Sequence, residues 1–207
     1  MPSQELTAIA LNGTLKSSSA GSPSSTDRML DLFEAELKKL NCTMERVRLA
    51  DFNIKPGVSS DEGSGDQWPD IRRRIVAADI VIAGSPVWMG QPSSVIKRVL
   101  ERMDAFLSDT DESGRMPSYG KVALVATVGN EDGAHHVSAE LYQALNDVGF
   151  SLAPNAVGYW VGEAMGSTDF KDLDSIPEGV STAVHMAAVC AVHMAGLLKQ
   201  HPFPSVN

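Results

Sequence analysis

A run of hydroxyl side chains near the N-terminus, NGTLKSSSAGSPSST over residues 12–26, is the stretch most suited to binding chemistry. It follows the short apolar run Thr7–Leu11 and precedes a segment whose apolar residues recur at helical spacing. Hydroxyls together with the free N–H groups of a helix N-terminus can hold a phosphate with few cations. A flexible Ser/Gly loop ending in an ordinary helix cap would have the same composition. The position after a buried strand favours the phosphate, with Thr14, Lys16, Ser24, Ser25 and Thr26 as the expected contacts.

Two common nucleotide-binding loops are excluded by their spacing. The phosphate-binding loop of NTPases needs Gly, four residues and then Gly-Lys-Ser/Thr, and no such string follows Gly13 or Gly21. The dinucleotide fingerprint Gly-x-Gly-x-x-Gly is also absent from this loop. A monophosphate held by hydroxyls and backbone is the interpretation that remains.

Two later loops also follow short apolar runs and could hold the rest of such a ligand. The loop SPVWMGQP (residues 85–92) follows Ile80–Ala83, and its Trp88 and Met89 offer a surface to an aromatic ring. Trp88 could instead plug the end of the sheet or contact a subunit. The loop TVGNEDGA (residues 127–134) offers backbone N–H groups. Together the three loops predict a site for a phosphorylated aromatic ligand.

Titratable residues near the third of these loops have simpler explanations than catalysis or metal binding. His135 and His136 are adjacent, and neighbours on a helix point about 100° apart, so both cannot easily bind one ion. We therefore expect no metal and place His135 beside the bound ring. Glu131 and Asp132 could repel anionic substrates, but stabilisation of the next helix N-terminus is the favoured interpretation.

The elements that must position these loops alternate between strand and helix. Continuous apolar runs such as Val122–Ala126 suit strands buried on both faces of a parallel sheet. Two weaker strands are expected at Thr43–Arg48 and at Phe150–Val157, where Pro154 indicates a sheet edge. Apolar stripes predict four helices. A fifth and last helix is expected at about Pro177–Gln200. The four stripes are Leu30, Phe33, Leu37 and Leu40; Trp68, Ile71 and Ile75; Ile96, Val99, Leu100, Met103 and Phe106; and Val137, Leu141, Leu145 and Val148.

Five strands alternating with five helices predict an α/β fold, a five-stranded parallel doubly wound sheet with helices on both faces. We expect residues 1–207 to form a single domain. Sheets of this kind bind ligands beyond the C-terminal ends of their strands, where the three loops begin.

Composition excludes several classes of function. The 26 acidic residues outnumber the 17 Lys and Arg, a net charge of -9 that disfavours nucleic-acid binding. Cys42 and Cys190 have no close partner, which indicates no metal knuckle or disulfide framework and a reducing, cytoplasmic setting. The apolar stretch Ala183–Leu198 contains two histidines and is shorter than the roughly 20 residues of a membrane span, so no membrane is expected.

Three motifs in this order resemble the flavodoxin-like NAD(P)H-dependent FMN reductases and quinone reductases. SPVWMGQPSSVIKRVLER is similar to their ring-binding loop and helix, NGTLK…SPSST to their FMN phosphate loop, and TVGNEDGAHH to their second ring-contacting loop. The resemblance implies a flavodoxin-like fold, non-covalent FMN and hydride uptake from NADH or NADPH. It also implies a homodimer or homotetramer acting on a small-molecule acceptor.

Carried over by motif, the resemblance implies a phosphate site and a ring site. The phosphate falls on Thr14, Lys16, Ser24, Ser25 and Thr26, and the ring on Pro86, Val87, Trp88, Met89 and Gly90 with Thr127, Val128, Gly129, Asn130, Asp132, Gly133 and His135. Relatives often carry Asn between the last Ser and Thr of the first loop, so Ser25 departs from the pattern. The cysteines of the family's iron–sulfur branch are missing around Ser59.

Because a flavin carries the electron chemistry itself, no catalytic side chain is assigned. Three further expectations concern other segments. We expect Arg72–Arg74 to form a solvated helix face rather than a contact to the 2′-phosphate of NADPH. The loop 50–67 is long, and long ordered loops tend to be functional. Trp68, Tyr159 and Trp160 are candidates to line the substrate pocket or to be buried at a subunit interface.

The main alternative is a flavodoxin-type electron carrier that binds FMN without oxidising NAD(P)H efficiently. A non-redox binding module or a hydrolase using Ser85 is weaker, because no Gly-x-Ser-x-Gly elbow is present.

Overall fold

The buried apolar runs form one parallel sheet in the computed structural model, which describes residues 5–207. Its strand order is β2-β1-β3-β5-β6, the flavodoxin-like order, so the predicted fold class is confirmed. A short extra strand, β4 (Gln91–Pro92), pairs antiparallel with β3 and was not predicted. The parallel strands are β1 (Leu6–Asn12), β2 (Cys42–Arg48), β3 (Ile80–Trp88), β5 (Val122–Gly129) and β6 (Ser151–Val161).

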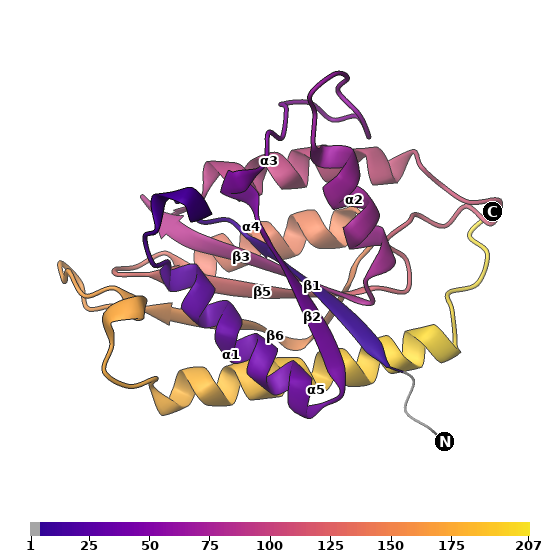
Figure 1. Cartoon of the computed structure of the whole chain (residues 1–207). Coiled ribbons are helices and arrows are strands. Elements are labelled where there is room, and N and C mark those ends of the chain that lie inside the picture. Colours follow the sequence, from indigo (N-terminus) through magenta and orange to yellow (C-terminus); the bar gives the residue numbers. More distant parts are fainter. Residues whose placement is uncertain (1–4) are drawn as a thin grey trace.

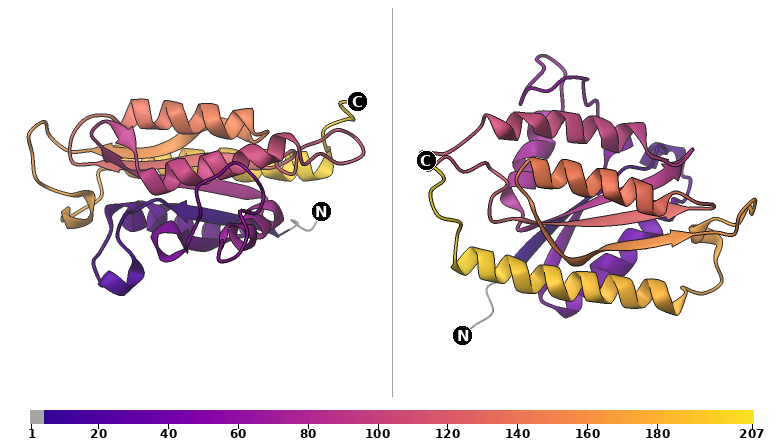
Figure 2. Two further views of the ribbon diagram at one scale, coloured as in Figure 1. Left: turned by 90° about the horizontal axis from the view of Figure 1, so that it is seen from above. Right: turned by 180° about the vertical axis from the view of Figure 1, so that it is seen from behind.

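Helices cover both faces of the sheet (Figures 1 and 2). One core cluster lies under α1 (Ser25–Lys39) and α5 (Glu178–Gln200). The other lies under α2 (Trp68–Ala77), α3 (Ser94–Met103) and α4 (Ala134–Asp147). The predicted helical stripes point into these two clusters, which confirms the helical periodicity.

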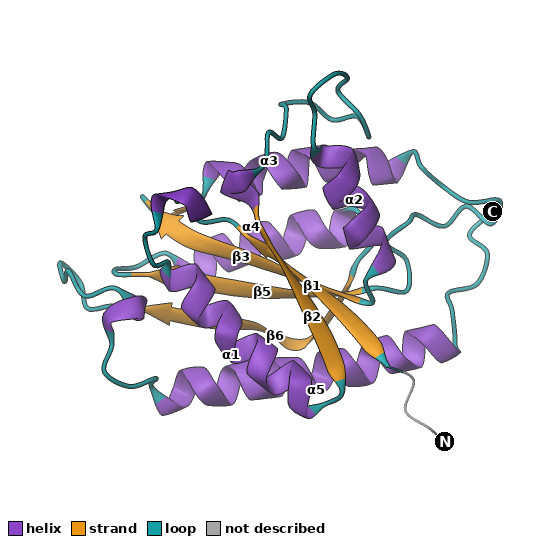
Figure 3. Ribbon diagram, in the orientation of Figure 1, coloured by secondary structure: helices purple, strands orange, loops and turns teal. Residues whose placement is uncertain are grey.

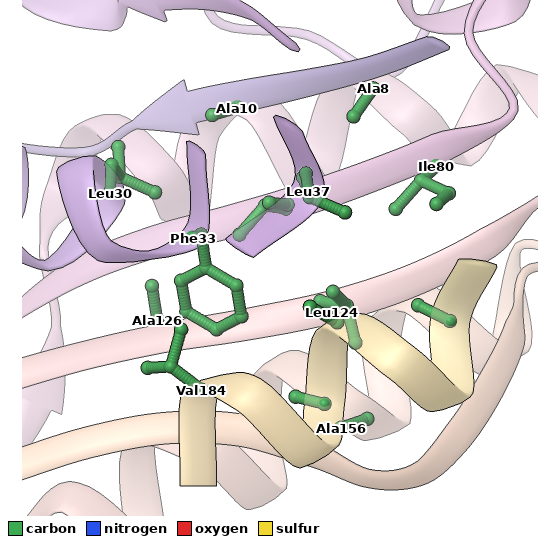
Figure 4. Close-up of a cluster of buried hydrophobic side chains, with 14 of the residues drawn as sticks. Ala8, Ala10, Leu30, Phe33, Leu37, Ile80, Leu124, Ala126, Ala156 and Val184 are labelled. Atoms are coloured by element: carbon green, nitrogen blue, oxygen red, sulfur yellow. The ribbon is translucent and has the colours of Figure 1, made fainter. Parts of the chain in front are cut away.

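The close packing of α1 and α5 on the sheet depends on small residues in the strands. Figure 4 shows the Phe33 ring of α1 beside Ala126 and Val184. A Cβ atom at Gly158 on β6 would lie 2.7 Å from Val184 and 2.9 Å from the Phe33 ring. Glycine at this position therefore lets both helices approach the edge strand.

β6 is the edge strand that Pro154 indicated. Its pairing with β5 shifts register, because Leu152 lies opposite Ala123 whereas Val157 lies opposite Val125. The extra residues form an irregular bulge that contains Pro154, which has no N–H to donate. The prediction of a sheet edge is confirmed.

The C-terminal helix is longer than the apolar stretch considered in the sequence. α5 has 23 residues, and by length and composition alone it could cross a membrane, so the expectation that it is too short is wrong. About 33% of its most apolar window is buried against the rest of the fold. The absence of a membrane stays a prediction.

The long loop 50–67 is fixed to α3 rather than placed over the strand ends. Arg102 is fully buried, forms a 2.8 Å ion pair with Asp66 and donates to the backbone oxygens of Lys55 and Ser59. Its guanidinium lies 5.7 Å from the ring centroid of Trp68, which is itself fully buried. The expectation that Trp68 lines a pocket or an interface is therefore wrong, because its helical stripe faces the core.

Candidate functional site

A cavity of about 630 Å³ lies at the C-terminal ends of β1, β3 and β5. Figure 3 shows the loops after β3, β5 and β6 leaving this same end of the sheet. Fourteen of the predicted site residues line the cavity: Thr14, Lys16, Ser24, Ser25, Thr26, Pro86, Val87, Trp88, Met89, Gly90, Val128, Gly129, Asn130 and Asp132. The three predicted loops therefore meet around one space.

The first turn of α1 forms the polar end of this cavity. Ser24 is the N-cap, and its hydroxyl accepts a 3.4 Å hydrogen bond from the N–H of Asp27. The N–H groups of Ser25 and Thr26 precede the first intrahelical bond and have no acceptor within the helix. The Thr26 Oγ1 atom is buried, and no partner for it lies among residues 5–207. A buried hydroxyl without a partner is costly unless a ligand satisfies it.

The backbone of the first loop is held close to β3, and this requires glycine. The N–H of Gly13 donates a 2.7 Å hydrogen bond to the Gly84 oxygen. A Cβ at Gly13 would lie 2.6 Å from that oxygen and 2.9 Å from Ile96 Cβ. The loop can therefore turn directly from β1 toward the N-terminus of α1.

A β-hairpin at the end of β3 forms the apolar end of the cavity. Met89 and Gly90 are the two turn residues, with φ angles of 50° and 74°, so the turn is of the type that requires positive φ at both positions. Methionine rarely adopts this conformation. The side chains of Trp88 and Met89 are 51% and 98% exposed, which leaves a broad apolar surface at the mouth.

The loop after β5 approaches the hairpin closely. A Cβ at Gly133 would lie 2.9 Å from the Gly90 Cα atom, and Gly133 has a φ of 119°. Gly133 is also the N-cap of α4, which has no side-chain cap and no acidic residue in its first turn. Glu131 and Asp132 precede this N-cap, and the Asp132 carboxylate accepts a 2.6 Å hydrogen bond from the Gly133 N–H. Both residues also line the cavity, so stabilisation of the helix N-terminus stays a prediction.

Three predicted site residues lie outside the cavity lining. Thr127 is buried, with its hydroxyl 3.3 Å from that of Ser138. Gly133 packs behind the lining against Gly90. His135 Nε2 lies 3.2 Å from the Tyr159 hydroxyl on β6 rather than at the cavity edge.

His136 pairs with Glu140 at 2.8 Å, separately from His135. Among residues 5–207, no group of three His, Cys, Asp or Glu side chains is placed to hold a metal ion. Trp160 and Tyr159 also lie outside the lining. Trp160 packs on Phe170, with ring centroids 5.4 Å apart.

The cavity includes residues that the sequence reasoning did not assign to it: Leu15, Glu131, Asp169 and Phe170. Asp169 and Phe170 come from the segment between β6 and α5, where Phe170–Asp172 form a 3₁₀ turn. Arg28 on α1 holds this segment by donating 2.8 Å hydrogen bonds to the Phe170 and Leu173 oxygens. The contact spans more than 140 positions in the sequence, so no local pattern indicates it.

The basic run Arg72–Arg74 is engaged in ion pairs outside the cavity. Arg72 pairs with Asp109 at 2.6 Å, and Arg74 with Glu45 at 2.5 Å. Arg73 is exposed, as predicted for a solvated face, whereas the side chains of Arg72 and Arg74 are largely covered. Within the described part of the chain, Lys16 is the one basic side chain on the cavity lining.

Comparisons with known proteins agree with the fold and the motifs. A family model described as "NADPH-dependent FMN reductase" matches residues 7–164. The chain is 33% identical over 163 residues to the divalent metal cation transporter MntH of Mycobacterium bovis, covering 77% of this chain and 24% of that protein. It is 32% identical over 168 residues to the 8-demethyl-8-aminoriboflavin-5′-phosphate synthase of Streptomyces davaonensis, covering 77% of this chain and 65% of that protein. The chain thus spans about a quarter of the first relative and just under two thirds of the second.

Among solved structures, the chain is similar to RosB with bound intermediate 8-demethyl-8-formylriboflavin-5′-phosphate. The TM-score is 0.86 at 27% sequence identity, over 96% of this chain and 82% of that chain.

Proposed function

The chain belongs to the NADPH-dependent FMN reductase family, and from this premise we propose that it is an FMN-dependent NAD(P)H oxidoreductase. It passes hydride from a nicotinamide cofactor through FMN to a quinone, free flavin or similar small acceptor. The buried, unpartnered Thr26 hydroxyl on the wall of the shared cavity is the observation that carries the proposal.

The polar end of the cavity fits a phosphate. Thr26 Oγ1 has no partner in the described part of the chain, the first N–H groups of α1 are free to donate, and Lys16 supplies a positive charge. Ser24 and Thr14 add hydroxyls to the same wall. This donor set holds a monoester phosphate without a metal ion.

The other end fits a flat aromatic ring. Trp88 and Met89 present apolar surface from the hairpin, and the loop 128–132 faces them across the cavity. A volume of about 630 Å³ is within the usual range for a pocket that encloses much of a cofactor. The hairpin and the β5 loop would therefore hold the ring between them.

Bound FMN would supply the hydride-accepting chemistry, and the chain's own residues position and shield it. We propose that backbone N–H groups near Met89, Gly90 and Gly129 would donate hydrogen bonds to the ring edge. The close approach of Gly133 to Gly90 fixes the spacing between the two loops. No side chain is assigned a proton-transfer step.

The charges around the cavity favour NADH over NADPH. Glu131, Asp132 and Asp169 line it, and Lys16 is the one cation that residues 5–207 contribute to the lining. The phosphate of FMN would pair with Lys16, and Arg72–Arg74 form ion pairs with acidic residues outside the cavity. The extra 2′-phosphate of NADPH would then meet an uncompensated acidic rim.

A homodimer or homotetramer in the cytoplasm is part of the proposal. The outer side of α5 exposes Met186, Val189 and Leu197, and no Asp, Glu, Lys or Arg lies between Glu178 and Lys199. An uncharged helix face of this length suits a subunit contact. Light scattering of the purified protein tests it, and a monomer at micromolar concentration would contradict it.

Steady-state turnover tests the choice of acceptor. Protein loaded with FMN is mixed with NADH and offered a quinone or excess free FMN, and oxidation of NADH is followed by absorbance. Turnover that depends on the small acceptor supports the reductase. Turnover only with a protein acceptor favours the alternative, a flavodoxin-type electron carrier.

A second candidate is a modification of the flavin ring itself. It is favoured by the 32% identity to an aminoriboflavin-phosphate synthase and by the structural similarity to a protein holding a formylated flavin phosphate. Mass spectrometry of the flavin recovered after turnover separates the two. An unchanged FMN mass supports the reductase, and a changed mass supports the modifying enzyme.

A further inference from the structure

A buried hydrogen-bond network lies directly behind the first loop of the cavity. Asn12, the last residue of β1, is fully buried. Its Oδ1 accepts a 2.9 Å hydrogen bond from the N–H of Thr14, which fixes the turn into the loop. Its Nδ2 donates a 2.6 Å hydrogen bond to Asp27 Oδ1 on α1. The backbone of Thr14 is thus tied through Asn12 to a carboxylate on the neighbouring helix.

The same carboxylate is held from the other side by the end of β2. Arg48 Nη2 donates to Asp27 Oδ2, and Arg46 Nη1 lies 3.5 Å from Oδ1. Arg48 also donates through Nη1 to the Lys16 backbone oxygen at 3.2 Å. One guanidinium therefore contacts both the helix residue and the loop.

Helix capping does not explain the position of Asp27. In the sequence S-S-T-D, Asp27 stands three residues after the N-cap Ser24, where a carboxylate can cap the N-cap N–H. Instead both of its oxygens are turned toward Asn12 and the arginines. A carboxylate beside a phosphate site is unfavourable unless cations neutralise it, and Arg46 and Arg48 provide those cations.

We infer that Asp27 and Arg48 are positioning residues that set the phosphate loop and thereby select FMN over riboflavin. Asp27 acts through Asn12 on the Thr14 backbone, and Arg48 acts directly on the Lys16 backbone. Neither side chain lines the cavity. The inference rests on the proposed FMN site.

Titration of the apoprotein with FMN and with riboflavin tests the inference, with flavin fluorescence as the readout. Asp27→Asn should weaken FMN binding about tenfold when it is measured at about 0.5 M salt, which screens the positive charge that the variant leaves on Arg46 and Arg48. This is the loss expected when hydrogen bonds to a charged group are removed. Riboflavin binding should change less than twofold, because riboflavin lacks the phosphate. The matched control is Asp31→Asn, one helical turn later, which pairs with Arg46 at 2.8 Å. Asp31 makes no contact with Asn12 or Arg48, so both affinities should stay at the wild-type value.

Arg48→Lys guards against a folding defect in the first variant, since it keeps the charge and loses the two-pronged contact. It should also weaken FMN binding without affecting riboflavin. Equal weakening of both flavins, or no weakening of FMN, in a folded variant overturns the inference. Failure of the wild type to bind FMN overturns the proposed function as well, and this result is visible before any variant is examined.

Discussion

Ser93 Oγ donates a 2.5 Å hydrogen bond to the carbonyl oxygen of Gly13, which lies 80 residues earlier in the sequence. The Ser93 N–H donates to Ser85 Oγ at 3.0 Å, and the Ser93 hydroxyl accepts from the Ile96 N–H at 3.4 Å. One fully buried serine therefore caps α3 and joins the phosphate end of the cavity to the strand that carries the hairpin.

Ser93→Ala should lower both stability and FMN affinity. Loss of the cap and of a buried hydrogen bond costs about 1–3 kcal/mol, or several degrees in Tm for a domain of this size. Thermal unfolding followed by circular dichroism measures the loss. Ser94→Ala removes the exposed neighbouring hydroxyl and is the control, and equal Tm values for the two variants would contradict the role given to Ser93.

Thr26→Val should separate ligand binding from stability. The substitution removes the unpartnered hydroxyl and keeps the shape, so the Tm of the apoprotein should stay equal or rise slightly. FMN binding should weaken about tenfold, because a hydrogen bond to a charged phosphate is lost. Riboflavin binding should stay unchanged.

Thr26→Ser should have the opposite effects on FMN affinity and on the Tm of the apoprotein. It keeps the hydroxyl but loses the methyl group that packs near Gly84. FMN affinity should be retained while the Tm of the apoprotein falls. The assignment of Thr26 to the phosphate is wrong if the valine variant binds FMN as tightly as the wild type.

Glu131→Gln should raise kcat/KM for NADPH more than for NADH. The carboxylate lines the cavity rim, and the 2′-phosphate makes NADPH the more anionic co-substrate. Added salt should reduce the wild-type preference for NADH, because it screens the rim. Glu112→Gln, on the loop far from the cavity, serves as control. A wild-type preference for NADPH at low salt would contradict the electrostatic argument.

The Asp66–Arg102 pair predicts a dependence of stability on pH. Burial alone would raise the pKa of Asp66, but the N–H groups of Glu62, Trp68 and Lys55 and the Arg102 guanidinium outweigh it and lower the pKa to about 2. Since this lies below the ordinary value of 3.8, the stabilisation is present above about pH 4 and is lost as the pH falls toward 2. Its size is about 2 kcal/mol.

Asp66→Asn should therefore destabilise the protein at pH 7, and the difference from the wild type should shrink below pH 4. Urea unfolding midpoints across this range measure it. FMN affinity should stay at the wild-type value, because loop 50–67 does not line the cavity. A difference that is constant with pH would contradict the shifted pKa.

Much of the fold follows from local patterns in the sequence. The buried run Ile80–Ala83 and the similar runs suit central parallel strands, and they form them. The helical stripes through Phe33 and Ile75 point into the core as expected. The rule that ligands bind beyond the strand ends then places the three loops around one cavity. The β4 hairpin was missed because it requires Met89 at positive φ, which methionine rarely adopts.

The parts of the site that the sequence does not predict depend on contacts between distant segments. Phe170 reaches the cavity because Arg28 binds its carbonyl oxygen, and Asn12, Asp27 and Arg48 meet only once β1, α1 and β2 are packed. Trp68 was misassigned because an aromatic side chain beside a long loop suits an interface as well as a core. The preceding loop is fixed by the buried Arg102, which no periodicity indicates.

The visible spectrum of the purified protein, after FMN addition and desalting and then after anaerobic NADH or NADPH, tests the central claim most directly. We expect retained flavin absorption bands that bleach with a nicotinamide cofactor, faster with NADH. Retained bands that neither cofactor bleaches would contradict the reductase function, and the absence of bound flavin would contradict the assignment of the cavity itself.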